Sequence, residues 1–520
     1  MLQQMKYPIG VQSFENIIQG GYAYVDKTDL VWQLAQKHIC FLCRPRRFGK
    51  SLLVSTLDAY FRGRKELFAG LKINDYEKDW EECPVLRVDF SNANFSEPDA
   101  LKNKLEAMVV DWERLYGKDE ARKNMGDRFQ YVISQAHTKS GKKVVVLIDE
   151  YDKPLLDVMG LPLEETNRNV LKEFYGTFKA ADEDLRFVLL TGVTKFSQVS
   201  VFSGFNQPYD ISMDSAFDAL CGITEEELHD VFAEPIEKMA KEYECTVDEM
   251  KDMLKRWYDG YHFSHGMLDI YNPFSIINAF SKLTFDSYWF ATGTPTYLQK
   301  LIDKRFVNLQ EMLSKSYEPS YFIDYRANAQ DPLAMLYQSG YLTIKSVNRR
   351  RNSYMLGFPN NEVQKGFVTL LAGDYLNTKT RIQPWICDID DMLQDCRLDD
   401  MRDAFTAFLA SIPYVANKDE RALNFETHFQ YTFYLLMRIL SCYDTLIEKQ
   451  NSQGRADMIV ETDNHVYIFE FKVDGSADEA LQQIEEKGYA EPYMTDKRQL
   501  HRIGVVISSE TRTVSEWMTI

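Results

Sequence analysis

The sequence has no long apolar run. No stretch approaches the ~18 consecutive apolar residues that a membrane-spanning helix needs, and the polar start at residues 1–4 has no signal-peptide core. We therefore expect a cytoplasmic protein with no membrane partner. The chain also lacks a surplus of basic residues. Its net charge of −18 argues against a general nucleic-acid-binding surface, so any such contact must be local or bridged by metal ions.

Cysteine and histidine form no recognisable metal or disulfide pattern in the sequence. Eight cysteines scattered over 520 residues do not make a disulfide framework. Cys40 and Cys43 have C-x-x-C spacing, but they lie in an apolar run without a partner pair, so we interpret them as buried thiols. His262 and His265 lie among glycine and serine with no cysteine or carboxylate to complete a ligand set, so we interpret them as structural.

Residues 44–51 read Arg-Pro-Arg-Arg-Phe-Gly-Lys-Ser, between an apolar run and an apolar helical pattern. The phosphate-binding motif G-x-x-x-x-G-K-[ST] supplies backbone N–H groups, a lysine and a hydroxyl to phosphates and Mg²⁺. Gly49, Lys50 and Ser51 fit this motif, whereas Arg44 replaces its first glycine. The predicted ATP-binding residues of the loop are Arg46, Arg47, Phe48, Gly49, Lys50 and Ser51.

A second element supports the first. Residues 144–148 are all apolar, as expected of a strand buried on both faces of a parallel sheet, and Asp149 and Glu150 follow at its carboxyl end. We predict that Asp149 holds Mg²⁺ together with Ser51, and that Glu150 polarises the attacking water. The alternative is a buried strand that ends in a solvated acidic turn.

Residues 186–194 predict a further strand that ends in small polar residues. In additional-strand NTPases a polar residue at this position contacts the γ-phosphate, so Thr194 is the sensor candidate; a simple strand-to-loop cap is the alternative. The alternation of strands and helices to about residue 215 specifies a parallel, doubly wound sheet. The capping box that begins at Thr224 predicts a helical segment to about residue 257.

The middle of the chain predicts a small module of another kind. Residues 331–358 read as helix, strand, basic turn and strand, which suggests a winged-helix-like fold. The arginines at 349–351 would lie at the wing tip, where they could contact phosphates. A solvated hairpin turn is the bland alternative and is slightly favoured. Residues 362–412 read as helical and linking.

The C-terminal region carries a second set of chemical groups. Asp457 begins one strand pattern, Glu470 and Lys472 end the next, and a helix with Gln483 follows. Alternation places Glu470 and Lys472 on one face of their strand. We predict that Asp457 and Glu470 bind Mg²⁺ or Mn²⁺ and that Lys472 stabilises charge at phosphorus. Two helical residues complete the predicted site, Glu426 as a further metal ligand and Gln483 as a partner of the water or of the lysine.

These motifs resemble a known bacterial family. Residues 24–28, 44–51, 190–193, 221–224 and 257–261 look like AAA-ATPase-like proteins, and residues 454–457, 469–473 and 480–484 look like the PD-(D/E)XK nuclease domain that such proteins carry at the C-terminus. The resemblance covers nearly the whole chain. It implies that Arg44 is the family's own variant, that Lys50, Ser51, Asp149 and Glu150 are nucleotide-site residues, and that Asp457, Glu470 and Lys472 are nuclease residues.

The predicted fold class is α/β with four parts. They are an AAA-like P-loop ATPase core at 1–220, a helical lid at 221–330, a winged-helix-like and linking region at 331–400, and a restriction-endonuclease-like nuclease domain at 401–520. The predicted function is ATP hydrolysis coupled to metal-dependent cleavage of nucleic acid, DNA rather than RNA. The alternative is a regulatory ATPase whose nuclease-like domain binds nucleic acid or a protein without cleaving. No residue can be assigned as an arginine finger between subunits, so a ring-forming NTPase is disfavoured and the oligomeric state stays open.

Overall fold

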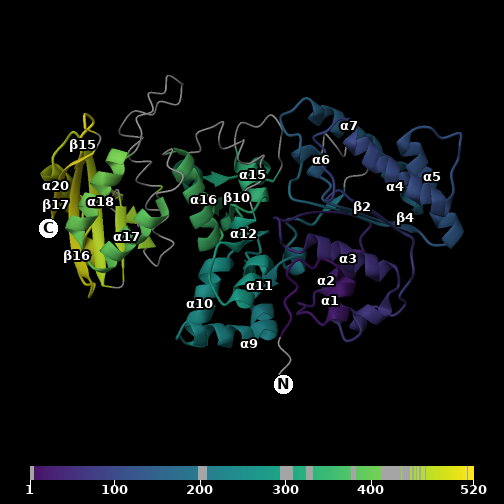
Figure 1. Cartoon of the computed structure of the whole chain (residues 1–520), viewed down its shortest axis with the longest axis horizontal. Coiled ribbons are helices and arrows are strands. Elements are labelled where there is room, and N and C mark those ends of the chain that lie inside the picture. The colour runs from purple at the N-terminus through teal and green to yellow at the C-terminus, as the bar shows by residue number, and fades with distance from the viewer. Residues whose placement is uncertain are drawn as a thin grey trace. The chain divides into compact units, whose positions relative to one another are not determined.

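The computed structural model divides into two compact units, Met1–Asn360 (unit 1) and Asn361–Ile520 (unit 2) (Figure 1). The four-part division of the chain stays a prediction. The described residues are 5–196, 208–292, 309–323, 332–375, 382–411, 435, 446–447, 450–451, 454–455, 458–462, 464–511 and 513–520.

Unit 1 is built on a five-stranded parallel sheet in the order β2-β3-β4-β1-β5. Its strands are β1 (Ile39–Cys43), β2 (Val85–Asp89), β3 (Val144–Asp149), β4 (Leu185–Gly192) and β5 (Tyr209–Asp210). Every residue of β3 is buried, which is why this strand reads as a continuous apolar run. Strand β4 lies between β1 and β3, as in additional-strand NTPases. The predicted parallel α/β sheet is therefore confirmed.

Helices cover both faces of this sheet. In Figure 1, α1, α2 and α3 lie on one side of the strands and α4, α5 and α7 on the other. Phe129 of α5 stacks on Phe174 of α7 with ring centroids 4.5 Å apart, and both rings are buried. The helices are α1 (Phe14–Gly20), α2 (Thr28–Ala35), α3 (Lys50–Phe61), α4 (Ala100–Tyr116), α5 (Met125–Ser140), α6 (Lys153–Leu156) and α7 (Leu163–Ala180).

The rest of unit 1 has a helical part and a small antiparallel sheet. The helical part begins at the predicted capping box, since the Thr224 side chain accepts from Glu227 N–H and the Glu227 side chain accepts from Thr224 N–H. Its elements are β6 (Ile223–Thr224), α9 (Glu225–Glu242), α10 (Val247–Tyr258), β7 (Ile270–Tyr271), α11 (Pro273–Lys282) and α12 (Tyr288–Ala291). Two helices separated by a turn thus replace the single predicted segment to residue 257.

The small sheet has the order β8-β10-β9. The elements here are α14 (Leu309–Ser314), β8 (Ser316–Tyr317), α15 (Leu333–Gln338), β9 (Thr343–Asn348) and β10 (Ser353–Gly357). The arginines at 349–351 lie in the exposed β9–β10 turn, as the sequence predicted. Whether this module is a winged helix that contacts phosphates stays a prediction.

Unit 2 contains a mixed sheet in the order β11-β14-β15-β16-β17, in which only the β15–β16 pair is parallel. Helix α20 connects these two strands, and Figure 1 shows α20 on one side of the sheet and α17 and α18 on the other. The strands are β11 (Leu446–Ile447), β12 (Gln450–Asn451), β13 (Gly454–Arg455), β14 (Met458–Glu461), β15 (His465–Val473), β16 (Gln499–Ile507) and β17 (Val514–Thr519). The helices are α16 (Asn361–Tyr375), α17 (Ile382–Gln394), α18 (Leu398–Ser411) and α20 (Ala477–Glu486).

The two faces of β15 contact different helices. Val466 and Ile468 pack in one apolar cluster with Leu481 and Ile484 of α20. Tyr467, which points to the other face, donates its hydroxyl hydrogen to the carbonyl of the α17 residue Leu393 at 2.7 Å. Even-numbered residues of β15 therefore face α20, and odd-numbered residues face α17.

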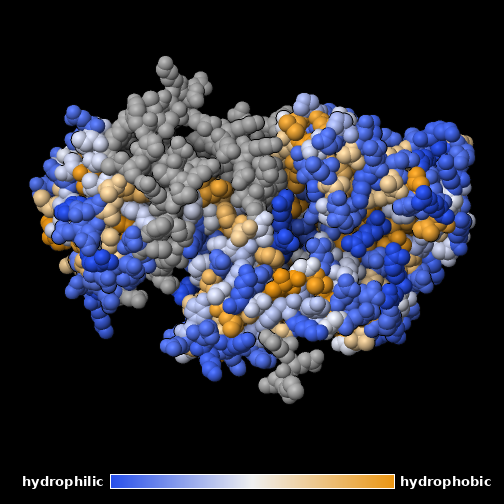
Figure 2. All heavy atoms as spheres, viewed as in Figure 1, coloured by the Kyte–Doolittle hydropathy of each residue, from blue (hydrophilic) through white to orange (hydrophobic). Residues whose placement is uncertain are grey.

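Hydrophilic residues dominate the face of the molecule drawn in Figure 2, and apolar residues form small groups. Large exposed apolar side chains are dispersed along the sequence, for example Leu115, Tyr321 and Met494. Among the described helices, none is long and apolar enough to cross a membrane.

Candidate nucleotide and nuclease sites

Lys50 is already bonded within the phosphate loop. Its Nζ atom donates to the carbonyl oxygens of Arg44 and Pro45, each at 2.9 Å, and the side chain is buried. Both acceptors are neutral. An anionic phosphate oxygen would form a stronger, charge-assisted hydrogen bond with the same ammonium group. The lysine is thus held at the loop in a position from which it can turn to a phosphate.

Other loop carbonyls are bonded to residues far along the chain. Trp289 Nε1 donates to Arg46 O at 3.0 Å, and Gly222 N–H donates to Phe48 O at 3.1 Å. Gly222 has a φ of 96°, and a Cβ there would lie 2.2 Å from Ile270 Cγ2, so this close approach requires glycine. Gly222, within the motif at residues 221–224, therefore holds the backbone of the phosphate loop through this hydrogen bond.

The N–H groups at the end of the loop have no such partners. In the described part of the chain, no protein acceptor takes the N–H of Gly49, Lys50 or Ser51, which precede or open helix α3. Arg47 (φ 66°) and Gly49 (φ 93°) have left-handed backbone conformations, which arrange successive N–H groups in a concave nest. Amide donors, a helix N-terminus and the Lys50 ammonium together form an anion-binding site.

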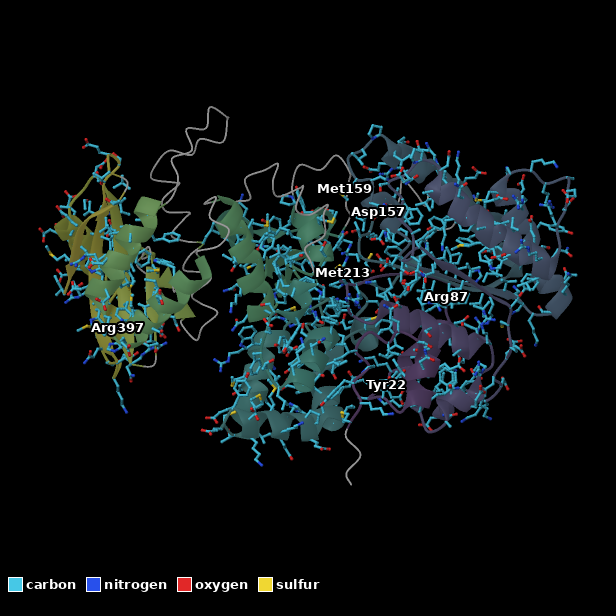
Figure 3. All side chains as sticks on the ribbon, in the orientation of Figure 1. Tyr22, Arg87, Asp157, Met159, Met213 and Arg397 are labelled. Carbon is cyan, nitrogen blue, oxygen red and sulfur yellow. The ribbon has the colours of Figure 1, made fainter. Side chains whose placement is uncertain are left out.

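A cavity of about 780 Å³ lies over this loop. That volume is within the range of about 300–1,000 Å³ typical of small-molecule sites. Its charged and polar lining includes Arg46, Arg47, Lys50, Ser51 and Glu150. Its apolar lining includes Ile9, Val11, Phe274 and Ile277. Figure 3 labels two further lining residues, Asp157 and Met159. The cavity thus offers cationic groups for phosphates and apolar side chains for a base.

The acidic end of β3 contributes two different carboxylates. Asp149 is 1% exposed and accepts a hydrogen bond of 2.8 Å from Thr191 Oγ1, but it does not line the cavity. Glu150 does line the cavity, and its φ of 54° is unusual for a residue with a side chain. Burial raises the pKa of Glu150, while the nearby Lys50 ammonium opposes that rise. A raised pKa makes Glu150 a better proton acceptor.

A third carboxylate, Asp152, was missed in the sequence. Its Oδ2 atom accepts from the N–H groups of Val193 (3.0 Å) and Thr194 (2.6 Å), so it fixes the backbone after β4. Burial raises the pKa of Asp152 to about 6, against the opposing effects of the Thr194 N–H and of Lys50. The Thr194 hydroxyl lies 3.8 Å from Met335 Sδ and does not line the cavity.

Arg44, which replaces the first glycine of the motif, is an anchor for the loop. It is 1% exposed, and its guanidinium donates to the carbonyls of Ser212 (2.7 Å) and Phe217 (3.2 Å). The same group lies 4.0 Å from the centroid of the Phe263 ring. Its role is to fix the start of the loop to the segment after β5. Of the other predicted loop residues, Phe48 is buried with its ring 4.8 Å from that of Tyr261.

In unit 2, Glu470, Lys472 and Gln483 form one hydrogen-bonded chain. Gln483 Nε2 of α20 donates to Glu470 Oε1, and Lys472 Nζ donates to Gln483 Oε1. Lys472 Nζ lies 3.6 Å from Glu470 Oε1. Glu470 is 2% exposed, whereas Lys472 is partly exposed. The structure therefore brings these three predicted residues together. Glu426 and Asp457 lie outside the described residues.

Gly504 of β16 allows α20 to pack closely against the sheet. It pairs with Glu470 across the β15–β16 ladder. A Cβ at this position would lie 2.5 Å from Ala477 O and 3.2 Å from the Ala480 side chain. The absence of a side chain here is what allows Gln483 to reach Glu470. In the sequence, the single glycine within the β16 pattern is the signal that another element packs closely against this strand.

His262 is a structural residue, as we interpreted it from the sequence. Its Nδ1 atom lies 2.7 Å from Ile344 O, and its Nε2 atom lies 2.7 Å from Asp269 Oδ1. His265 is exposed. Both nitrogens of His262 thus have protein partners that link the helical part to the small sheet.

The strand order, the phosphate loop and the acidic end of β3 define a P-loop nucleotide-binding core. Glu470 and Lys472 on a strand of a mixed sheet, with Gln483 on the helix packed against it, are the groups of a nuclease-type domain. A family model described as "Predicted AAA-ATPase" matches residues 8–202, and one described as "PD-(D/E)XK nuclease superfamily" matches residues 424–517.

A relative matches nearly the whole chain. The protein described as "Uncharacterized protein in vnfD 5'region", from Azotobacter chroococcum mcd 1, is 36% identical over 521 residues, which cover 99% of this chain and 98% of the relative. A solved structure of the Aeropyrum pernix ORC1 protein in complex with DNA is 9% identical, with a TM-score of 0.22, over 66% of this chain and 92% of that chain. The chain belongs to the family of predicted AAA-ATPases with a C-terminal PD-(D/E)XK nuclease domain.

Proposed function

We propose that the protein binds and hydrolyses ATP, and that it cleaves phosphodiester bonds of nucleic acid with the help of a divalent metal. DNA is the favoured substrate over RNA, and the nucleotide state controls cleavage. The observation that carries the nuclease half is the bonded chain Glu470–Gln483–Lys472. Gln483 bonds to both the buried carboxylate and the lysine, Lys472 Nζ lies 3.6 Å from Glu470 Oε1, and the lysine still reaches solvent. A carboxylate and an ammonium group preorganised at this spacing suit metal-dependent cleavage of a phosphodiester.

In the ATP site, each group of unit 1 has a separate role. The loop N–H groups and Lys50 bind the phosphates, and the apolar side of the cavity receives the base. Glu150 accepts the proton of the attacking water, for which its raised pKa suits it. Ser51 and Asp149 offer hydroxyl and carboxylate oxygens, the ligands that Mg²⁺ prefers. Thr194 is the proposed sensor of the γ-phosphate. Thr191 is a second polar residue of β4 with a proposed role, because its hydroxyl donates to Asp149 and so orients that carboxylate.

In the nuclease site, Glu470 offers carboxylate oxygen to Mg²⁺ or Mn²⁺, with Asp457 and Glu426 as the further proposed ligands. Such a metal, when bound, polarises the phosphodiester and lowers the pKa of a bound water. Lys472 is placed 3.6 Å from Glu470 to stabilise negative charge at phosphorus. Gln483 holds the carboxylate and the ammonium in register, since it bonds to both.

A regulatory ATPase whose C-terminal domain binds without cleaving is the second candidate. Residues 401–520 contain twelve basic and nineteen acidic residues, a net charge of −7. This charge opposes unaided binding to the phosphate backbone. The net negative charge of residues 401–520 therefore favours the regulatory candidate, whereas the arrangement of Glu470, Lys472 and Gln483 favours the nuclease.

The test is cleavage of linear duplex DNA, single-stranded DNA and RNA by the full chain in Mg²⁺ or Mn²⁺. Each substrate is incubated without nucleotide, with ATP and with a non-hydrolysable ATP analogue. Lys472→Ala tests the nuclease site, and Lys487→Ala, an exposed lysine just after α20, is its matched control. Lys50→Ala tests the nucleotide site.

Cleavage that is lost in Lys472→Ala, kept in Lys487→Ala and altered by ATP only when Lys50 is present supports the proposal. Equal effects of ATP and its analogue assign control to binding rather than hydrolysis. ATP turnover with binding but no cleavage of any substrate, in either metal, favours the regulatory candidate. Cleavage that Lys472→Ala leaves intact contradicts the assigned nuclease site.

A further inference from the structure

A second cluster of metal-binding side chains lies in unit 2, away from Glu470. Cys396 lies in the turn between α17 and α18, His465 begins β15, and His501 lies in β16. Figure 3 labels Arg397, the next residue after Cys396, and so marks this turn. Among the described residues, Cys396, His465 and His501 form a group of three possible metal ligands, and their ligand atoms all lie within 4.8 Å of one another.

The cluster and the nuclease residues lie on opposite faces of the same strand. His465 and Tyr467 are odd-numbered residues of β15, on the face toward α17, whereas Glu470 bonds to Gln483 of α20. His501 pairs with Tyr467 in the parallel β15–β16 ladder, so its side chain shares the α17 face. The cluster is therefore a separate site.

Hydrogen bonds cannot join all three ligand atoms to one another at once, although Cys396 also has the Tyr467 hydroxyl as a hydrogen-bonding neighbour. Cys396 Sγ lies 3.5 Å from His501 Nε2, and His465 Nδ1 lies 3.1 Å from the same nitrogen. A ring nitrogen carries either one hydrogen or one in-plane lone pair, so His501 Nε2 makes one good hydrogen bond. Two atoms compete for it. A cation between the three atoms would bind all of them at once.

Two of the three distances between the ligand atoms match a tetrahedral metal centre, and the third, from Cys396 Sγ to His465 Nδ1, is no more than 4.8 Å. With zinc–nitrogen bonds of about 2.0–2.1 Å and a zinc–sulfur bond of about 2.3 Å, tetrahedral angles separate two nitrogens by about 3.3 Å, and a nitrogen from a sulfur by about 3.5 Å. The observed separations are 3.1 Å and 3.5 Å. We propose that Cys396 Sγ, His465 Nδ1 and His501 Nε2 bind a zinc ion, with the fourth position taken by water or another donor.

The surroundings orient these ligands. The Tyr467 ring stacks on His501 with centroids 4.9 Å apart and planes 17° apart, and its hydroxyl is fixed by Leu393 O. The fixed Tyr467 ring therefore restricts the orientation of the His501 imidazole. Cys396 has a φ of 55°, an uncommon conformation for a non-glycine residue. Burial lowers the pKa of His465 and of His501, a direction that favours the neutral imidazole that binds metal.

The donor set also separates this site from the nuclease site. Thiolate and imidazole favour zinc, whereas the carboxylate of Glu470 favours Mg²⁺ or Mn²⁺. A zinc ion here joins the α17–α18 turn to the start of β15 and to β16. It would therefore fasten the helices of unit 2 to the strands that carry Glu470 and Lys472, without touching either residue.

The first experiment measures zinc by mass spectrometry in the full chain, purified without chelator and under reducing conditions. We expect about one zinc ion per chain. Cys396→Ser and His501→Ala should lose it. The matched controls Cys245→Ser and His265→Ala, a free cysteine and an exposed histidine of unit 1, should keep it. No zinc in the wild type after incubation with zinc, or equal zinc in Cys396→Ser, overturns the proposal.

A second experiment needs no variant, so it remains decisive if the substitutions impair folding. Cobalt substituted into the wild-type chain should show a thiolate-to-metal charge-transfer absorption. Zinc should slow alkylation of Cys396, identified by peptide mass spectrometry, and a chelator should restore it, whereas Mg²⁺ should do neither. Cobalt bound without the thiolate band, or a Cys396 alkylation rate that ignores zinc, overturns the proposal.

Discussion

The proposed nucleotide site of unit 1 and the proposed nuclease site of unit 2 hold their lysines in different ways. Lys50 donates to two backbone carbonyls, beside a cavity of about 780 Å³. Lys472 donates to the side chain of Gln483, which in turn bonds to Glu470. One lysine is thus held by neutral backbone of its own loop, and the other by a side-chain network shared between a strand and a helix.

This difference teaches what each site requires of its ligand. The nucleotide site is a cavity whose loop carbonyls are already bonded to Trp289 and Gly222, so the ligand itself supplies the missing acceptors for the loop N–H groups. The nuclease site is preorganised by packing of α20 on β15, so its geometry depends on the fit between helix and sheet. Substitutions in unit 1 should therefore act on ligand binding, and those in unit 2 should act through the position of α20.

The largest effect is expected from Lys50→Ala. Loss of the ammonium removes charge stabilisation at the phosphates, so kcat/KM for ATP hydrolysis should fall by about 10²- to 10³-fold. Lys153→Ala is the matched control, because Lys153 lines the same cavity but pairs with Asp157 at 2.7 Å. It should cost less than about tenfold. Equal losses of kcat/KM in the two variants would show that ATP hydrolysis depends on the net charge of the cavity and not on the loop lysine in particular.

Gln483→Ala tests the network of unit 2. Without the amide, Glu470 and Lys472 lose their common partner, and metal-dependent cleavage should fall by about 10- to 100-fold. Gln482→Ala, next to it on α20, is the control, since the Gln482 side chain donates to Glu486 in an exposed pair on the surface of the helix. Steady-state cleavage and ATP hydrolysis are both measured. ATP hydrolysis should be unchanged, and a fall there would mean that the substitution acts beyond the hydrogen-bonded network of unit 2.

Gly504→Ala tests whether packing of α20 limits unit 2. The added methyl group meets Ala477 O at 2.5 Å, and such overpacking costs about 1–3 kcal/mol. For a unit of this size the midpoint of thermal unfolding should fall by about 3–10 °C. Gly176→Ala in α7, where a Cβ meets no atom within 4 Å, is the control and should not destabilise unit 1. An unchanged unit 2 transition would refute the tight contact.

The smallest effect concerns pH and Asp152. Its pKa is raised from 3.8 to about 6 in the folded chain, so between these values the folded state binds more protons than the unfolded state. Stability due to this group therefore falls as pH rises from about 4 to 6. Asp152→Asn cannot ionise, so its stability relative to wild type should rise over that window, on the order of 1 kcal/mol.

Urea denaturation of both proteins at closely spaced pH values measures this difference. Asp269→Asn is a control of opposite sign, because the hydrogen bond to His262 lowers the pKa of Asp269. Its stabilising effect is lost only as pH falls below the ordinary value, so this variant should show no rise between pH 4 and 6. A flat curve for Asp152→Asn would mean that the carboxylate stays charged on folding.

Much of the fold follows from local sequence signals. The apolar run at 144–148 specified a strand buried on both faces, and the Thr224 capping box specified the start of α9. The alternation of Glu470 and Lys472 placed both on one face of β15. These signals lie within a few residues of one another, where periodicity and capping chemistry act. The strand order was not predictable in the same way, since it depends on pairing between distant segments.

The missed residues share a long sequence separation. Asp152 bonds to backbone at 193–194, and Trp289 bonds to the phosphate loop. Cys396 and His501 are likewise brought together by folding. No spacing rule connects such positions in a single sequence. Arg44 was visible as a departure from the motif, but only its buried contacts show why a cation stands there.

The burial of Arg44 also bears on the thermodynamics of nucleotide binding. A phosphate loop that begins with glycine loses backbone entropy when a ligand orders it. Here the guanidinium bonds to Ser212 and Phe217 fix the start of the loop before any ligand arrives. Much of the ordering cost is therefore borne during folding, and the association step should carry a smaller entropy penalty than a flexible loop would impose.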